Sequence, residues 1–410
     1  MTPELRRTLG VFDAVVVGLG AMVGAGIFVA LGPAAEAAGT GMLPALGVAA
    51  VVAYCNAMAS ARLAARYPAS GGTYVYGRER LGPFWGYLAG WAFVVGKTAS
   101  CAAMALTVGA YVWPAHAHAV AVAAVVALTA VNYRGVQKSA LLTRVIVAVV
   151  LAVLAAVVTV SAGAGQAERL GLAAELPRGG VLQAAGLLFF AFAGYARIAT
   201  LGEEVRDPER TVPRAVPIAL GIALAVYAAV AVCVLAVLGP EGLAASAAPL
   251  ADAARAADAG WLVPVVSVGA AVAALGSLLS LILGVSRTTL AMARDGHLPA
   301  TLAAVHPRHR VPHHAELAVG AVVALVAATA DVRGAIGFSS FGVLVYYGIA
   351  NASAWTLGRR ERPLAMLGLA GCGALAFALP PTAVLAGTGV LAVGVVAYAV
   401  GRGRPAAPGA

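Results

Sequence analysis

Long apolar runs alternate with short, charge-rich segments along the whole chain of 410 residues. Most runs are roughly 20 residues long, the length at which a helix crosses the hydrocarbon core of a bilayer. Reading the runs between charged or Pro-containing breaks predicts twelve spans, at 12–35, 42–65, 84–112, 117–133, 140–162, 181–203, 213–238, 261–290, 315–330, 335–358, 364–380 and 382–401. The pattern therefore predicts an all-α polytopic membrane protein.

Composition supports this interpretation. Hydrophobic residues make up 61% of the chain and charged residues 11%, whereas soluble domains are about 45–50% apolar and about 25% charged. No segment between the runs is long enough to fold a catalytic domain outside the membrane. The four cysteines lie inside apolar runs without metal-binding spacing, so we expect no metal and no cofactor.

Basic residues gather in alternate loops. Of the 27 Lys and Arg residues, 21 fall in the loops that share a side with the two termini, four fall in the opposite loops and two fall inside spans. Because cytoplasmic loops of membrane proteins are rich in Lys and Arg, both termini are predicted to be cytoplasmic, in a cell (plasma) membrane protein. This distribution also explains the net charge of +10, so no nucleic-acid partner is expected.

Spans 1 and 6 carry sequences that weaken a helix. Span 1 holds four glycines between Gly18 and Gly26, and span 6 holds Gly194 among aromatic residues. The glycines could permit close helix packing, or they could mark unwound segments, which at membrane depth must line a cavity. Interrupted spans at corresponding positions of two halves point to a transporter binding site, where helix N–H groups suit a carboxylate and freed carbonyls suit an ammonium.

Five segments resemble the amino acid–polyamine–organocation (APC) superfamily of secondary transporters. They are GAMVGAGIF at 20–28, YPASGGTYVYGRERLG at 67–82, NYRGVQKSA at 132–140, FFAFAGYARIATLGEEVRDPERTVPRA at 189–215 and AMARDGHLP at 291–299. The resemblance implies a LeuT-like fold of two inverted repeats, 12–162 and 181–358, with two additional spans at 364–401. It also implies that the substrate carboxylate binds the backbone N–H groups of one segment, Met22, Val23, Gly24, Ala25 and Gly26.

By the same resemblance, Phe192, Ala193 and Gly194 would offer carbonyls to the substrate amino group, and Tyr195 or Phe192 would form an aromatic lid. Two departures from the family pattern concern coupling and specificity. Val150 stands where proton-coupled relatives often have a Lys. Ala196 and Arg197 follow the Gly-aromatic pair where relatives for cationic substrates often have an acidic residue. The departures leave the coupling mechanism open and argue against a cationic substrate.

Charged residues inside or beside the spans are the coupling or gating candidates. Lys97 lies in the middle of span 3, where insertion of a lysine costs about 2.5–3.5 kcal/mol; it could form a structural ion pair, snorkel, or act in the site as a titrating group. Arg197 could pair with a carboxylate or form a gate, and Glu203 and Glu204 follow at the cytoplasmic end of span 6. On span 8, Ser277 and Ser280 are expected to bond back to their own helix, with a cation site as the alternative.

These features together predict a secondary active transporter that moves amino acids by alternating access, with neutral amino acids preferred and proton coupling to be tested. An amino acid exchanger or exporter, and a carrier of polyamines or other amines, remain alternatives. A channel would need a filter sequence or charged rings, and an intramembrane enzyme would need a motif such as HExxH or GxSxG; the sequence contains neither motif. The expected partners are a small amino acid and the lipid bilayer, and the oligomeric state stays open.

Overall fold

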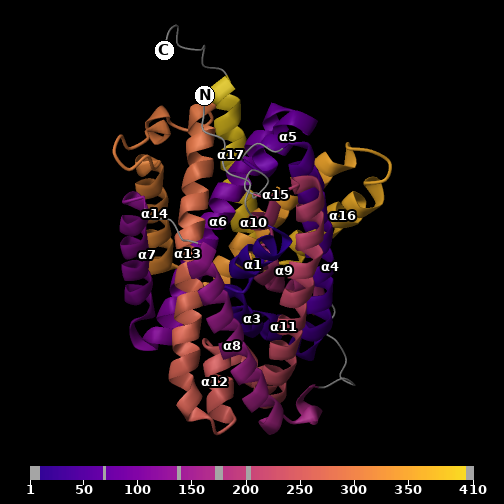
Figure 1. The fold of residues 1–410 in the computed structure, drawn as a ribbon, viewed down its shortest axis with the longest axis vertical. Helices are drawn as coiled ribbons and strands as arrows, with labels where there is room; N and C mark the ends of the chain where they lie inside the picture. The colour runs from indigo at the N-terminus through magenta and orange to yellow at the C-terminus, as the bar shows by residue number, and fades with distance from the viewer. Residues whose placement is uncertain (1–9, 68–70, 136–139, 171–178, 200–204, 403–410) are drawn as a thin grey trace.

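The computed structural model describes residues 10–67, 71–135, 140–170, 179–199 and 205–402. These residues form helices joined by turns, with no strand in the described ranges, and Figure 1 shows the helices gathered into one elongated bundle. In chain order they are α1 (Val11–Met22), α2 (Ala25–Val29), α3 (Leu31–Ala38), α4 (Met42–Arg66), α5 (Thr73–Leu81), α6 (Pro83–Val112), α7 (Ala117–Tyr133), α8 (Ala140–Ala164), α9 (Gly180–Phe192), α10 (Ala196–Ala199), α11 (Pro208–Ala245), α12 (Pro249–Ala256), α13 (Val263–Arg294), α14 (His313–Thr329), α15 (Val332–Trp355), α16 (Arg362–Ala378) and α17 (Pro381–Arg402).

Length and apolar composition confirm a polytopic membrane protein. Within the described residues, nine helical segments are long and apolar enough to cross a bilayer. Three shorter apolar helices, α9, α14 and α16, coincide with the other expected spans. The count of twelve spans therefore stays a prediction, whereas the all-α class is confirmed.

Most expected spans match observed helices closely, but span 7 differs at both ends, since α11 runs from Pro208 to Ala245 with a kink at Gly239. The helix α11 begins at Pro208 rather than near residue 213. Proline fits the first turn of a helix because its missing N–H would have no partner there. The first part of α11 contains charged residues, so a prediction based on apolar runs placed the start of the helix too late.

The short helices in the loops, α5 and α12, lie at opposite ends of the bundle. Figure 1 shows α5 at one end and α12 at the other. Near α5, Arg78 pairs with Asp295 at 2.9 Å and Arg62 pairs with Glu361, so three loops expected on the cytoplasmic side meet. At the other end, Arg333 pairs with Glu36. Loops expected on one side of the membrane thus contact one another.

The centre of the bundle holds α1 and α9 (Figure 1), with α2 against α6 and α9 against α15. The helices α6 and α15 are mostly buried, whereas few residues of α7 and α17 are buried. A Cβ on Gly96 of α6 would lie 3.2 Å from the Cα of Gly342 on α15, so glycine lets the two backbones approach. Because their backbones pack so closely, α6 and α15 form one continuous surface next to the two interrupted spans.

Candidate functional site

The first span is interrupted within its glycine-rich segment. The helix α1 ends at Met22, Val23 has φ −77° and ψ 57°, Gly24 has φ −108° and ψ −143°, and α2 begins at Ala25. The unwound segment is thus confirmed at residues 23–24. The first N–H groups of a helix have no acceptor within it, so the start of α2 presents donors beside the interruption.

The sixth span is interrupted at the expected glycine. The helix α9 ends at Phe192, residues 193–195 form a turn, and α10 follows from Ala196. The Ala193 carbonyl oxygen accepts a hydrogen bond from Lys97 Nζ at 3.2 Å, and the Tyr347 hydroxyl lies 3.5 Å from the same oxygen. The interruption therefore provides a carbonyl acceptor at membrane depth.

The two interruptions lie directly against each other. A Cβ built on Gly194 would lie 2.1 Å from the Ala21 carbonyl oxygen and 2.7 Å from the Met22 nitrogen. Only a glycine fits between these backbones. The two interruptions are therefore packed together at this point of the structure.

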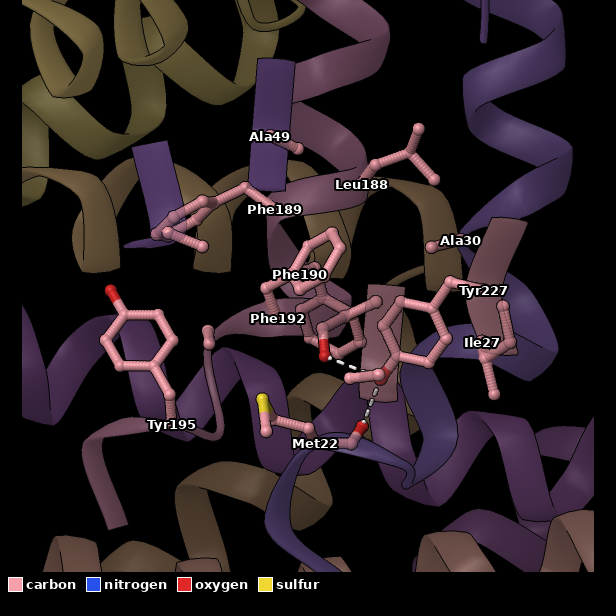
Figure 2. Packing of buried hydrophobic residues seen from close by; sticks show 14 of the residues in the cluster. Met22, Ile27, Ala30, Ala49, Leu188, Phe189, Phe190, Phe192, Tyr195 and Tyr227 are labelled. Atoms are coloured by element: carbon pink, nitrogen blue, oxygen red, sulfur yellow. Dashed lines mark hydrogen bonds between the residues drawn. The ribbon is translucent and has the colours of Figure 1, made fainter. Parts of the chain in front are cut away.

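One tyrosine that the sequence reading missed connects the two interrupted helices. The Tyr227 hydroxyl of α11 lies 2.7 Å from the Met22 carbonyl oxygen and 3.0 Å from the Ala191 carbonyl oxygen (Figure 2). Its ring packs edge-on against Phe192, with centroids 5.1 Å apart. A lone tyrosine in the Ala- and Val-rich middle of span 7 was the available signal.

The glycines of span 1 have different neighbours. A Cβ on Gly24 would lie 2.3 Å from the Ser277 Oγ of α13, whereas a Cβ on Gly26 would lie 2.6 Å from the Ala191 Cα of α9. Gly24 therefore faces a side chain, and Gly26 permits two backbones to pack. The segment thus shows both predicted properties: the helix is interrupted at Gly24, and two helices pack closely at Gly26.

Ser277 differs from what we expected for it. Its hydroxyl is buried and has no hydrogen-bond partner within the described ranges. Ser280 does bond back to its own helix, at 3.1 Å from the Gly276 carbonyl oxygen. The back-bonding prediction is thus confirmed for Ser280 and wrong for Ser277, whose free hydroxyl lies beside Gly24 at the first interruption.

Aromatic rings form one side of the second interruption. Tyr195 is 1% exposed, and its ring lies 4.9 Å from that of Tyr347 on α15. Phe189 approaches Tyr347 edge-on, with centroids 6.0 Å apart. Tyr347 also escaped the sequence reading, because the order of residues in span 10 does not reveal which face meets α9.

The charged candidates fall in three different environments. Lys97 is 7% exposed, and no carboxylate among the described residues forms an ion pair with it. Arg197 lies in α10 and is exposed. Glu203 and Glu204 lie outside the described residues. Lys97 bonds through its side chain to the second interruption.

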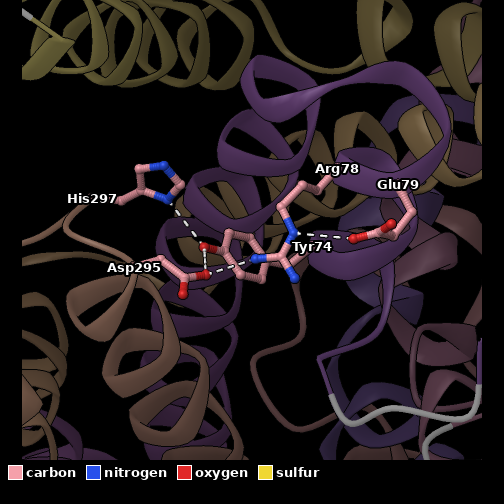
Figure 3. Close-up of polar contacts among 5 residues, drawn as sticks. All are labelled: Tyr74, Arg78, Glu79, Asp295 and His297. Atoms are coloured by element: carbon pink, nitrogen blue, oxygen red, sulfur yellow. Dashed lines mark hydrogen bonds and ion pairs between the residues drawn. The ribbon is translucent and has the colours of Figure 1, made fainter.

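A polar cluster joins α5 to the loop after α13, away from the interruptions (Figure 3). The Tyr74 hydroxyl donates to Asp295 and lies 3.0 Å from His297 Nδ1, while Arg78 pairs with the same carboxylate at 2.9 Å. Burial lowers the pKa of His297 below its ordinary value, although Asp295 opposes this shift. Burial is the main cause that raises the pKa of the Tyr74 hydroxyl, and the nearby Asp295 carboxylate raises it further.

Comparison with known proteins gives a family match over almost the whole chain. A family model described as amino acid permease matches residues 9–407. A Mycobacterium tuberculosis protein described as an uncharacterized transporter is 74% identical over 405 residues, 97% of this chain and 92% of the relative. The branched-chain amino acid permease BcaP of Bacillus subtilis is 26% identical, over 79% of this chain and 75% of the relative. Human cationic amino acid transporter 4 is 30% identical, over 85% of this chain and 59% of the relative.

Proposed function

Because the chain belongs to the amino acid permease family, we propose that it is a secondary active transporter that binds its amino acid at the two interrupted helices and moves it by alternating access. Its relatives are transporters rather than enzymes, as the family resemblance and the missing catalytic motifs predicted. Uptake, export and exchange all follow from the same reversible cycle, and the gradients present decide the direction.

The observation that carries this proposal is the direct contact between the two helix interruptions, where the backbone leaves the regular helical pattern. The N–H groups from Met22 to Gly26 would hold the substrate carboxylate, those of Val23 and Gly24 after leaving the Leu19 and Met22 carbonyls, with the free Ser277 hydroxyl beside them. The carbonyls from Phe192 to Gly194 would hold the amino group. Tyr195 or Phe192 would then cover the ligand. Since the interruptions are packed together, binding requires them to separate.

A stability assay on the purified protein tests this function. Each of the twenty amino acids is added in turn, and the melting temperature is measured. A ligand that binds only the folded state raises the free energy of unfolding by about 2.7 kcal/mol at one hundred times its dissociation constant. At least one amino acid should stabilise the protein and drive saturable counterflow in vesicles. Failure of all twenty in both assays would contradict the proposal.

We also propose a preference for neutral amino acids. The Lys97 ammonium lies at the Ala193 carbonyl, and a cationic substrate side chain in this low-dielectric site would be repelled by it. One relative is named for branched-chain and another for cationic amino acids, so the names of the relatives do not decide the substrate. Excess arginine should leave the uptake of labelled leucine or alanine nearly unchanged; strong inhibition would contradict the preference.

Lys97 is also the proposed coupling residue, because Val150 replaces the lysine that proton-coupled relatives often have in span 5. Arginine keeps its charge and cannot release a proton near neutral pH. In vesicles with an imposed proton gradient, Lys97→Arg should therefore abolish accumulation while exchange of bound amino acid continues. Lys97→Ala should also abolish the response to the gradient. Accumulation by the arginine variant would exclude Lys97 as the coupling group.

The proposed architecture follows from the same site. The interruptions occur in the first helix of each proposed inverted repeat, 12–162 and 181–358, with 364–401 added as two further spans. The meeting of the basic loops at one end of the bundle supports cytoplasmic termini in a plasma membrane protein. Labelling of single cysteines placed in α5 and α12, from outside intact cells, would test this orientation.

A further inference from the structure

The Lys97 side chain connects α6 to the interruption that follows α9. Its ammonium donates to the Ala193 carbonyl oxygen over 3.2 Å, and the side chain is 7% exposed. An ammonium carries three N–H donors, and this carbonyl is the one acceptor that the described part of the chain shows for it. A buried cation is therefore held by a neutral peptide group, without a carboxylate from the described residues.

The Ala193 carbonyl is available to Lys97 because the helix does not use it. The Arg197 N–H, four residues further along, bonds to the Gly194 carbonyl instead, at 3.0 Å. Under the function proposed above, on which this inference rests, the same carbonyl accepts the amino group of the substrate. Two ammonium groups repel each other strongly in a low-dielectric interior, so Lys97 and a bound amino group would exclude each other at this oxygen.

The backbone around Lys97 cannot easily retreat. The neighbouring Gly96 packs against the backbone of Gly342, with 3.2 Å between the position of a Cβ on Gly96 and the nearest atom. Lysine has a flexible four-carbon stem. The movable part of this contact is therefore the Lys97 side chain, which can leave the carbonyl while α6 stays against α15.

From this arrangement we infer that Lys97 supplies an internal ammonium in the subsite for the substrate's amino group. An amino acid has to displace Lys97 in order to bind. A carboxylic acid of the same side chain that lacks the α-amino group meets no such obstacle, because Lys97 provides the missing cation. The protein therefore also binds simple aliphatic and aromatic monocarboxylates, a ligand class in addition to amino acids.

Matched ligand pairs on the full-length purified protein test this inference. The probes are leucine, alanine and phenylalanine, each compared with its deaminated analogue: 4-methylpentanoate, propanoate and 3-phenylpropanoate. Binding is measured for the wild type, for Lys97→Met, which keeps the length of the side chain without its charge, and for Lys97→Arg, which keeps the cation. Thr98→Val is the control, because the Thr98 hydroxyl bonds to the Val94 carbonyl of its own helix at 2.7 Å.

At least one deaminated analogue should bind the wild type within about tenfold of its parent amino acid. Lys97→Met should weaken that analogue at least tenfold and strengthen the amino acid, whereas Lys97→Arg and Thr98→Val should keep the order of the wild type. An unchanged ratio of the two affinities in Lys97→Met would overturn the inference.

The wild type alone also decides the question if Lys97→Met does not fold. Binding of leucine, alanine or phenylalanine together with no binding of any of the three deaminated analogues contradicts an internal ammonium. Binding of none of the six compounds, nor of any of the other seventeen amino acids, would mean that the proposed carrier function has failed, and this inference with it. The two failures are therefore distinguishable.

Discussion

At the residue scale, Tyr227 is the side chain that holds both interrupted helices. Its hydroxyl reaches the carbonyl oxygens of Met22 and Ala191. Tyr227→Phe should keep the ring against Phe192 but leave two buried acceptors without this donor, a loss of about 1–3 kcal/mol in the free energy of unfolding. The measurement is the melting temperature with and without a bound amino acid. Tyr54→Phe, on an exposed tyrosine of α4, is the control; equal effects of the two variants would contradict the role of Tyr227.

Gly24 and Ser277 give a second prediction at this scale. Gly24→Ala places a Cβ 2.3 Å from the Ser277 Oγ, so it should lower both stability and substrate binding. Adding Ser277→Ala removes that oxygen and should restore most of the stability, since the two changes share one contact. Binding should remain impaired, because a Cβ still separates the substrate from the backbone. Additive losses of stability in the double variant would show that this contact is not the cause.

Sequence alone could not distinguish the two glycines. Gly24 and Gly26 belong to one short motif, and what separates them is Ser277 for the first and Ala191 for the second. These neighbours are far away in the chain. A valine at Gly26 would strike the backbone of α9, so that substitution reports on helix packing rather than on the contact with the carboxylate. Residue roles in this motif depend on three-dimensional neighbours.

At the element scale, the positions of both interruptions were predictable and their contact was not. Clustered glycine in span 1 and Gly194 in span 6 marked where the helices would break, because glycine weakens a helix interior. The direct contact of Gly194 with Ala21, and the link through Tyr227, depend on how α1, α9 and α11 are placed in the bundle. Apolar runs predict that a helix exists but do not predict which of its faces meets another helix.

The helix α5 and the loop after α13 give a prediction about pH. Because burial lowers the pKa of His297 below its ordinary 6.5, the unfolded chain binds a proton at this residue before the folded protein does as the pH falls. The free energy of unfolding should therefore decrease from about pH 7.5 to about pH 5.5. Asp295, Arg78 and Tyr74 surround His297 in this cluster, and the rings of Tyr87 and Tyr398 pack against it from α6 and α17.

His297→Gln keeps a polar side chain and removes the titration. Its melting temperature should fall less between these two pH values than that of the wild type. His116→Gln, at an exposed position beyond α6, serves as the control. An identical pH dependence in His297→Gln and the wild type would show that His297 does not contribute to it.

At the scale of the whole molecule, the pattern of apolar runs was sufficient for the class of the fold. Bilayer thickness fixes helix length, and loop charge is strongly asymmetric, so both features are visible in one sequence. The identity of the substrate is a different matter. It depends on which side chains of α6, α13 and α15 face the interruptions, and Ser277 and Tyr347 became visible there only in three dimensions.

The most direct test of the central claim is a cryo-electron microscopy structure of the protein with the amino acid that stabilises it most. Our account predicts ligand density between the first turn of α2 and the carbonyl groups of residues 192–194. It also predicts that Gly194 has moved away from Ala21 and that Lys97 has left the Ala193 oxygen. Ligand density elsewhere in the molecule, with the two interruptions still packed together, would contradict the account.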